Sequence, residues 1–418
     1  MKTLTAVPLL ALMLALGLSA SAARANSETE LLHLESELSL TTWKFDAHDR
    51  LSRLAERHPS DARVLANMGV ADERLGRWRQ SLEHYERSLA IDPESIDTLK
   101  AKSYLHALEG PHLRLDQWYR DTSNQETQWI SRIHAREFVT DHYTVGATYE
   151  HRYIEGSIER QRFDGTLGIF EGHRNRYEAY VERAHDFAST RLSLLGQEET
   201  PGAALAHIKE LPVGRLLLRG AYHDPYWVLV EALADEGTAD RLEAAWIYEG
   251  HSHVGGEFKG PSPVTGSIGT RLNRYGLDDD SHVAESLEIL IELRYRFLDF
   301  WPGLSVGYGF DAEYASLTAT RTDINGDSFH PLPLQSTQVH SWDVSLSHDL
   351  THHLHFDLTT GFSYDNRIDA SRPFVYGTLI RDTLNSFQLG LNFEFNQESN
   401  RGINNTFTQF GGFLVWRF

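Results

Sequence analysis

Residues 286–297 read Ser-Leu-Glu-Ile-Leu-Ile-Glu-Leu-Arg-Tyr-Arg-Phe, and this stretch decides the fold. Every odd position in it is apolar, whereas the even positions, apart from Leu290, are polar or charged. A β-strand turns successive side chains to opposite faces, so the stretch predicts a strand with one apolar and one charged face.

The same alternation recurs through residues 111–418, near 142–153, 174–186, 214–223, 239–250, 266–276, 304–314, 337–348, 354–364 and 387–395. A soluble sandwich also alternates. However, these strands are about ten residues or longer, which is the length a tilted strand needs to cross a bilayer. Tyr, Phe and Trp recur near the strand ends, where aromatic girdles lie in membrane barrels. We therefore predict a mainly β fold, with a C-terminal antiparallel transmembrane β-barrel of about 16 strands.

The sequence allows two interpretations for each of two regions of the predicted barrel. Residues 226–236 fit either a strand or a short helix in the lumen, and residues 365–382 fit either a long loop or part of an extra strand pair.

The chain ends Phe-Gly-Gly-Phe-Leu-Val-Trp-Arg-Phe over residues 410–418. Apolar residues alternate up to a terminal phenylalanine, with Leu414, Trp416 and Phe418 on one face. This ending resembles the assembly signal of bacterial outer-membrane barrels. The resemblance implies two partners, the outer-membrane assembly machinery and the outer-membrane lipids.

Residues 1–25 have the pattern of a secretory signal peptide. Lys2 supplies the positive start, residues 9–18 form a short apolar run, and Ala23-Arg24-Ala25 is a small-x-small cleavage pattern before Asn26. No second long apolar stretch follows, and the 418 residues contain no cysteine. We expect an exported protein without disulfides, located in the cell outer membrane.

Residues 26–110 have helical periodicity. Pro59 and Pro93 lie 34 residues apart, and similar residues precede each of them. This spacing resembles the tetratricopeptide repeat, a pair of antiparallel helices closed by a proline. The second unit, residues 62–95, carries Met68-Gly69 where that family has Leu-Gly, and residues 96–108 supply a capping helix. We expect a small all-α repeat domain in the periplasm, either as a docking surface for a partner or as a remnant packed on the barrel.

Residues 111–418 hold 43 Asp and Glu against 26 Lys and Arg, and the whole chain has a net charge of −20. Charges on the lipid-facing side of a strand are costly, so strand charges should face the lumen. Parity predicts an acidic lumen set that consists of Glu150, Glu243, Glu249, Glu288, Glu292, Asp311, Glu313, Asp343 and Asp357. The set fits either an electronegative conduit or a network paired with arginines such as Arg152 and Arg294.

Three motifs have the form of chemical sites. Gly303 to Gly307 matches the pattern of a hydrolase nucleophile elbow around Ser305, but alternation runs through it where an elbow needs a sharp turn. His348, His352, His353 and His355 cluster without metal-ligand spacing, and Asp323 to Asp327 lacks the glycine and glutamate of a calcium loop. We therefore expect no enzyme activity, no metal and no cofactor.

The combination of export signal, repeats and barrel resembles the outer-membrane proteins of synthase-dependent exopolysaccharide export, such as the cellulose, poly-N-acetylglucosamine and Pel export porins. It is also similar to shorter repeat-plus-barrel proteins of unclear role. The first resemblance implies a cationic or hydroxyl-rich polysaccharide as substrate, and a periplasmic modification enzyme or scaffold as partner. The acidic charge excludes nucleic acid. The alternatives are a general porin for small solutes, a structural or receptor barrel, and a barrel enzyme.

Overall fold

The computed structural model of the chain describes residues 29–40, 44–122, 126–157, 159–254, 257–277, 280–298, 303–396 and 406–418. For residues 230, 249–254, 257–262 and 280–281 it describes only the backbone. The expected signal peptide, residues 1–25, lies outside the described residues.

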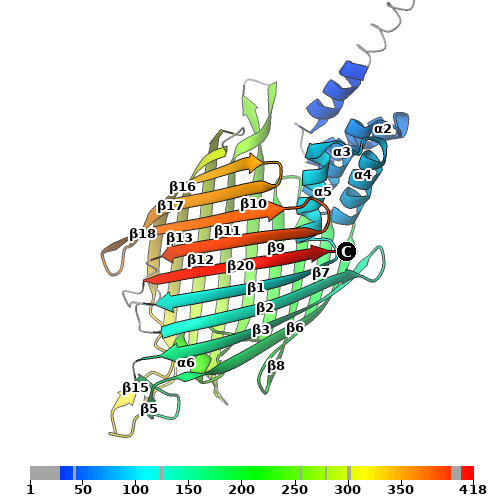
Figure 1. Cartoon of the computed structure of the whole chain (residues 1–418). Coiled ribbons are helices and arrows are strands. Elements are labelled where there is room, and N and C mark those ends of the chain that lie inside the picture. Colours follow the sequence, from blue (N-terminus) through cyan, green and yellow to red (C-terminus); the bar gives the residue numbers. More distant parts are fainter. Residues whose placement is uncertain are drawn as a thin grey trace, which may run out of the picture.

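Sixteen antiparallel strands form one closed barrel (Figure 1). Their bounds are β1 His112–Thr122, β2 Glu126–Phe138, β3 Tyr143–Gly156, β6 Glu171–His185, β7 Ala188–Gln197, β8 Thr200–Glu210, β9 Arg215–Pro225, β10 Thr238–Val254, β11 Glu257–Leu277, β12 Asp280–Leu298, β13 Gly303–Leu317, β16 Thr337–Thr351, β17 Leu354–Asp365, β18 Ala370–Asp382, β19 Phe387–Asn396 and β20 Phe407–Arg417. The predicted barrel and its strand number are confirmed.

The barrel closes where the last strand meets the first. β20 pairs with β1 along its whole length, so Leu414 lies opposite Leu115 and Trp416 lies opposite Leu113. Closure leaves neither strand with an unpaired edge, which a sheet in hydrocarbon requires.

Alternation assigns the two faces of each strand. On β12, Leu293, Tyr295 and Phe297 are exposed on the outer surface. Their neighbours along the strand, Glu292 and Arg294, therefore point into the barrel. The large apolar residues exposed on the outer surface are those that a lipid environment would cover.

The two ends of the barrel differ. At the end that carries the helices and the C-terminus, called here the helical end, each described connection has four residues or fewer. At the opposite far end, residues 157–170, 226–237 and 318–336 form long connections. The first and last of these hold two-stranded hairpins, β4–β5 (Arg160–Gln161, Leu167–Gly168) and β14–β15 (Arg321–Thr322, Ser328–Phe329). Outer-membrane barrels show the same asymmetry, with short periplasmic turns and longer extracellular loops.

The structure decides between the alternatives that the sequence left for residues 226–236 and 365–382. Residues 226–236 contain a short helix, α6 (Val230–Ala234), and no strand. Residues 370–382 are β18, a full barrel strand paired with β17 and β19.

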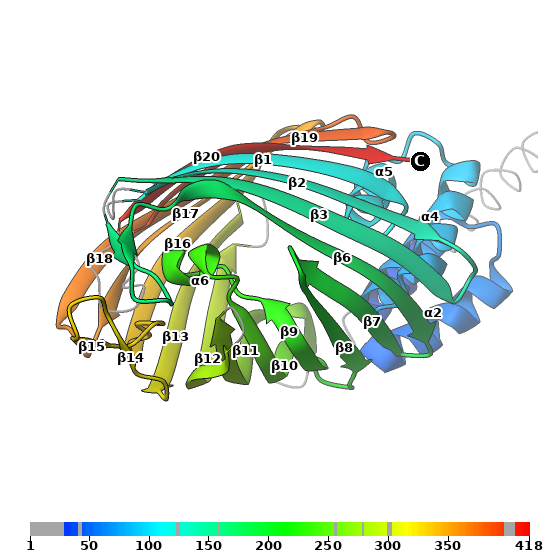
Figure 2. The same ribbon diagram turned by 90° about the horizontal axis from the view of Figure 1, so that it is seen from below.

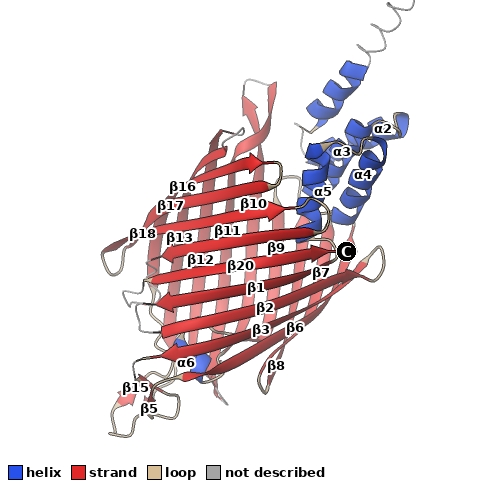
Figure 3. Cartoon of the chain, viewed as in Figure 1, coloured by secondary structure: helices blue, strands red, loops and turns tan. Residues whose placement is uncertain are grey.

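The N-terminal part is helical (Figure 3). Residues 29–39 form the first helix, followed by α2 Lys44–Arg57, α3 Ala62–Arg74, α4 Trp78–Ile91 and α5 Ile96–Leu108. Asp61 caps α3 by accepting hydrogen bonds from the backbone N–H groups of Arg63 and Val64. At Gly69 a Cβ would overlap the Tyr85 ring, so this glycine lets α3 and α4 approach closely. None of the described helices is long and apolar enough to cross a membrane.

Polar contacts fix the helices to the barrel at the helical end. Lys44 Nζ lies 2.5 Å from Glu210 Oε2, and Arg136 Nη1 lies 2.7 Å from Glu109 Oε2. Lys100 Nζ lies 2.7 Å from Asp349 Oδ2. These contacts involve β2 and the β8 and β16 ends, so the helical region is anchored at several points around the rim.

Candidate functional site

The interior of the barrel, toward which the polar faces of the strands point, is the candidate site. Eight of the nine predicted carboxylates lie on the inward faces of the strands and point into the barrel. They are Glu150, Glu243, Glu288, Glu292, Asp311, Glu313, Asp343 and Asp357. For Glu249 the backbone is described within β10, and its side chain lies outside the described part of the chain.

Glu150 lies at the centre of the densest cluster. Its buried carboxylate contacts three guanidinium groups, those of Arg132 at 2.5 Å, Arg152 at 2.8 Å and Arg176 at 2.8 Å. These residues come from β2, β3 and β6, because the register places Arg132 and Arg176 opposite Glu150 on either side. Such charge-assisted bonds across three strands stabilise this part of the wall.

The carboxylates of β10 to β13 are also partnered. Arg271 bridges Glu243 at 3.3 Å and Glu288 at 2.7 Å. Glu288 faces Glu313 directly across the β12–β13 pair, and the Tyr275 hydroxyl donates to Glu313 at 3.2 Å.

The remaining members of the set differ in their surroundings. Asp343 pairs with Arg294 at 2.9 Å, and Asp357 contacts His355 at 3.0 Å. Glu292 is exposed and makes no ion pair with another described residue, and Asp311 is exposed as well. Glu292 is therefore the member of the acidic lumen set that has no ion-pair partner among the described residues.

On the wall formed by β1 to β7, burial separates the partners of each ion pair. The Asp116 carboxylate is 2% exposed, and the guanidinium of its partner Arg114 is 33% exposed. The Glu182 carboxylate is 7% exposed and the guanidinium of Arg191 is 36% exposed. The carboxylates of these pairs are more deeply buried than the guanidinium groups, so this wall presents guanidinium N–H donors to the passage.

Residues 226–237 fold into the far mouth of the barrel, and Figure 2 shows α6 within the curve of the strands. Trp227 and Leu233 are buried and pack with Ile154 of β3 and with Phe170 of the 157–170 connection. Tyr226 packs in a second cluster that includes Tyr275 and Leu332. This segment, called here the mouth segment, therefore occupies part of the passage.

Side chains of the wall hold the backbone of the mouth segment. Arg174 donates to the carbonyls of Leu233 at 2.6 Å and Ala234 at 2.7 Å. Gln197 donates to the carbonyls of Glu236 and Gly237, each at 2.8 Å. These contacts satisfy carbonyl groups that would otherwise be buried without partners.

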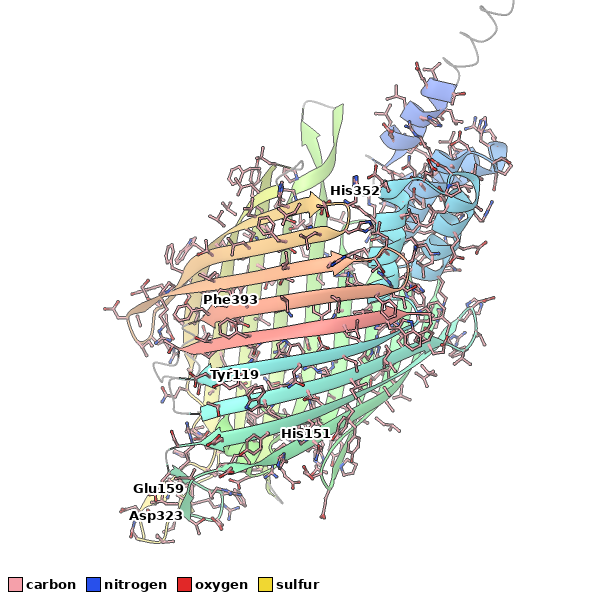
Figure 4. All side chains as sticks on the ribbon, in the orientation of Figure 1. Tyr119, His151, Glu159, Asp323, His352 and Phe393 are labelled. Carbon is pink, nitrogen blue, oxygen red and sulfur yellow. The ribbon has the colours of Figure 1, made fainter. Side chains whose placement is uncertain are left out.

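In each of the three motifs that have the form of a chemical site, a key side chain forms hydrogen bonds or ion pairs with neighbouring residues. Ser305 lies inside β13, a continuous strand with no sharp turn at this position, and accepts a hydrogen bond from Arg294 at 3.1 Å. His355 lies between Asp349 and Asp357, at 2.7 and 3.0 Å. Asp323 accepts hydrogen bonds from the N–H groups of Asn325 and Asp327, which closes a polar turn. Figure 4 places Asp323 and Glu159 at the far end and His352 at the helical end. The described residues contain no group of three or more metal-ligating side chains placed to hold an ion.

The lumen also holds aromatic residues that the sequence reading missed, because it assigned aromatics to the outer girdles. Trp118, Phe413 and Tyr180 face inward. The signal for Trp118 was its parity, since it shares the even positions of β1 with Arg114 and Asp116. On the outer wall, by contrast, Figure 4 shows Tyr119 and Phe393.

The C-terminal residues lie on the outer face near the helical end. Trp416 and Phe418 are exposed, and the Trp416 ring stacks with Phe387 at a centroid distance of 6.4 Å. Leu414 lies opposite Leu115 on β1. Their role as an assembly signal stays a prediction.

No family model and no curated protein matches the sequence. Among solved structures, a bacterial polysaccharide outer membrane secretin is similar at a TM-score of 0.55 and 12% identity, over 73% of this chain and 98% of that one. A Salmonella typhi OmpF complex with daunomycin and an anion-selective porin from Comamonas acidovorans each match at a TM-score of 0.38, with 7% and 10% identity, over 73% of this chain and 96% and 98% of theirs. The likeness to the secretin shows that this chain has the fold of an outer-membrane barrel.

Proposed function

We propose that the protein is an outer-membrane channel that exports a hydroxyl-rich exopolysaccharide. One observation carries the proposal: the β1 to β7 wall presents several guanidinium groups, such as those of Arg114, Arg132 and Arg191, whose carboxylate partners are buried. Such a surface donates hydrogen bonds while its net charge is largely cancelled. The fold shared with a polysaccharide outer membrane secretin supports the same reading.

The guanidinium groups of the β1 to β7 wall would replace the water molecules that hydrate the sugar hydroxyls. Sugar hydroxyls that leave bulk solvent need new partners, and guanidinium groups offer several donors in fixed directions. Many weak sites in series allow a chain to enter and to leave, as conduction requires. We favour the hydroxyl-rich class of polymer over the cationic class, because most predicted carboxylates are already paired.

We further propose that the helical end faces the periplasm, since the short turns lie there. The helix over residues 29–39 exposes Leu31, Leu34 and Leu38, which share one face. This stripe is our candidate docking surface for a periplasmic modification enzyme or scaffold. Leu34→Asp should reduce polymer secretion while the conductance of the purified protein stays unchanged.

A general porin for small solutes is the second candidate, and the mouth segment favours it. A segment fixed by Arg174 and Gln197 restricts the passage, which suits solutes smaller than a polymer. The two functions differ in how permeation depends on solute length.

Proteoliposome swelling separates the two candidates. Vesicles that contain the full chain are challenged with neutral oligosaccharides of increasing length, with protein-free vesicles as the control. An exporter should admit long oligosaccharides as well as short ones. A sharp cut-off after small sugars would leave the porin as the better account, and no swelling with any solute would contradict both.

A further inference from the structure

Three inward aromatic rings lie against glycines of neighbouring strands. A Cβ at Gly411 would overlap the Trp118 ring, and a Cβ at Gly390 would overlap the Phe413 ring. The same relation holds between Gly146 and Tyr180. Trp118 and Phe413 are half-buried and so keep part of their surface open to the passage, whereas Tyr180 is only 5% exposed.

A guanidinium group lies over each of these rings. Arg132 is 5.2 Å from the centroid of Trp118, Arg114 is 4.4 Å from that of Phe413, and Arg191 is 4.2 Å from that of Tyr180. All three distances fall in the range of cation–π contacts. Each aromatic ring is therefore flanked by a planar group of hydrogen-bond donors.

The charges of these guanidinium groups are balanced locally. Arg114 donates to both oxygens of Asp116, and two nitrogens of Arg191 donate to Glu182. Arg132 donates twice to Glu150. The carboxylates are buried, so the surface offers N–H groups and flat apolar faces with little net charge.

The three units lie on one wall of the barrel. Tyr180 lies toward the helical end, the Phe413 unit lies in the middle of β20, and Trp118 lies closer to the far end. A cavity of about 440 Å³ adjoins the Trp118 unit and is lined by residues that include Trp118, Arg114, Arg132 and Thr148. The Phe413 and Trp118 units stand one two-residue step apart along β1, which is about 7 Å.

We propose that the Trp118 and Phe413 units form a track that binds neutral, six-membered sugar rings, with the Tyr180 unit supporting the wall beside them. The apolar face of a sugar would pack on the exposed part of the Trp118 and Phe413 rings, and its hydroxyls would accept hydrogen bonds from the adjacent guanidinium groups. The inference deepens the proposed function by naming the part of the lumen that contacts the polymer and the polymer's charge class. An ion pathway alone would not need flat aromatic faces set between the arginines.

The test measures binding, which needs no transport. The detergent-solubilised full chain is titrated calorimetrically with cellohexaose as the neutral probe, and with hexamers of galacturonate and glucosamine as the anionic and cationic probes. Saturation-transfer NMR reports which sugar protons approach the protein. We expect cellohexaose to bind with an affinity that is the same at about 0.1 M and about 1 M salt, because screening weakens only charge attraction.

The variants separate stacking from folding. Trp118→Leu keeps apolar bulk but removes the flat face, and should weaken binding about tenfold, the scale of one lost stacking contact. Trp118→Phe should retain most of the affinity. Trp129→Leu is the matched control on the outer surface of β2 and should bind normally. Heat-modifiable gel mobility checks that every variant is folded.

Two results would overturn the track. One is binding confined to a charged hexamer and lost at high salt. The other is equal affinity in folded Trp118→Leu and in the wild type, or no binding of cellohexaose to the wild type. Binding that behaves as expected in a protein that moves no oligosaccharide into proteoliposomes would instead remove the proposed export function and leave the track.

Discussion

Trp118 on β1 and Gly411 on β20 lie opposite each other across the seam that closes the barrel, and the indole occupies the place of a side chain at position 411. The seam of the barrel and the wall of the passage thus depend on the same pair of residues.

Gly411→Ala should destabilise the barrel by about 1–3 kcal/mol, the usual cost of inserting a methyl group into a packed site. The new Cβ would overlap Trp118 Cδ1 and lie 2.7 Å from the Gln117 carbonyl oxygen. The measurement is urea unfolding in detergent. Gly168→Ala is the control, since a Cβ there meets nothing within 4 Å. Equal stability of the Gly411 variant and the wild type would contradict the placement of the indole.

Arg174→Gln should loosen the mouth segment and raise single-channel conductance, because it removes the donors to Leu233 and Ala234. Arg183→Gln is a matched control on the outer face of the same strand, where the guanidinium lies over Tyr143. Planar-bilayer recording compares the two variants with the wild type. The same conductance in all three would mean that the segment does not limit the passage.

Lys44→Met should detach or unfold the helical region, because it leaves Glu210 as a buried carboxylate without its ammonium partner. Breaking a buried ion pair costs about 3–5 kcal/mol, so the double change Lys44→Met/Glu210→Met should recover most of the loss. Arg57→Ala, which removes an ion pair between exposed groups, should cost less than about 0.5 kcal/mol. Urea unfolding followed by circular dichroism of the helices measures all three, and a mild Lys44 variant would refute the anchor.

The helical region should lose stability in weak acid. Burial, aided by the positive charges of Lys102 and Arg417, lowers the pKa of His106 to about 4. In the unfolded chain the pKa is about 6.5, so the folded state binds fewer protons between these values. The contribution of this histidine is complete above about pH 6.5 and is lost as the pH falls toward about 4.

Hydrogen exchange of α5, corrected for intrinsic rates, tests this at pH 7 and pH 5. The wild type should open more readily at pH 5, and His106→Gln should lose most of that difference. His58→Gln, at an exposed histidine of the same region, should behave like the wild type. An unchanged pH response in the His106 variant would assign the effect to another group.

The barrel could be predicted from sequence because each strand repeats one simple rule, apolar outside and polar inside. The alternation of residues 286–297 alone identified the outward face of β12. The sequence left residues 226–236 open between a strand and a short lumen helix, because Tyr226 and Trp227 are buried by strands and by two connections that are distant in sequence.

The charge of the lumen was harder to infer than its polarity. Parity placed Glu150 inside but could not show that three arginines surround it while its own oxygens are buried. Parity could also have placed Trp118 on the same face as Arg114, although it could not have shown the glycine beside it. The exposure of a side chain and the orientation of a ring depend on the residues of the neighbouring strands. The sequence of one strand does not show which residues of its neighbours lie beside it.

Single-channel recording tests the central claim most directly, using the full chain and a variant with residues 228–236 replaced by two glycines. Tyr226 N–H donates to the Gly237 carbonyl at 2.8 Å, so the ends of the mouth segment already meet and the replacement leaves a short turn. We expect discrete conductance steps from both proteins, larger steps from the variant, and brief interruptions when cellohexaose is added on the helical side. A folded variant that conducts no current would contradict the channel.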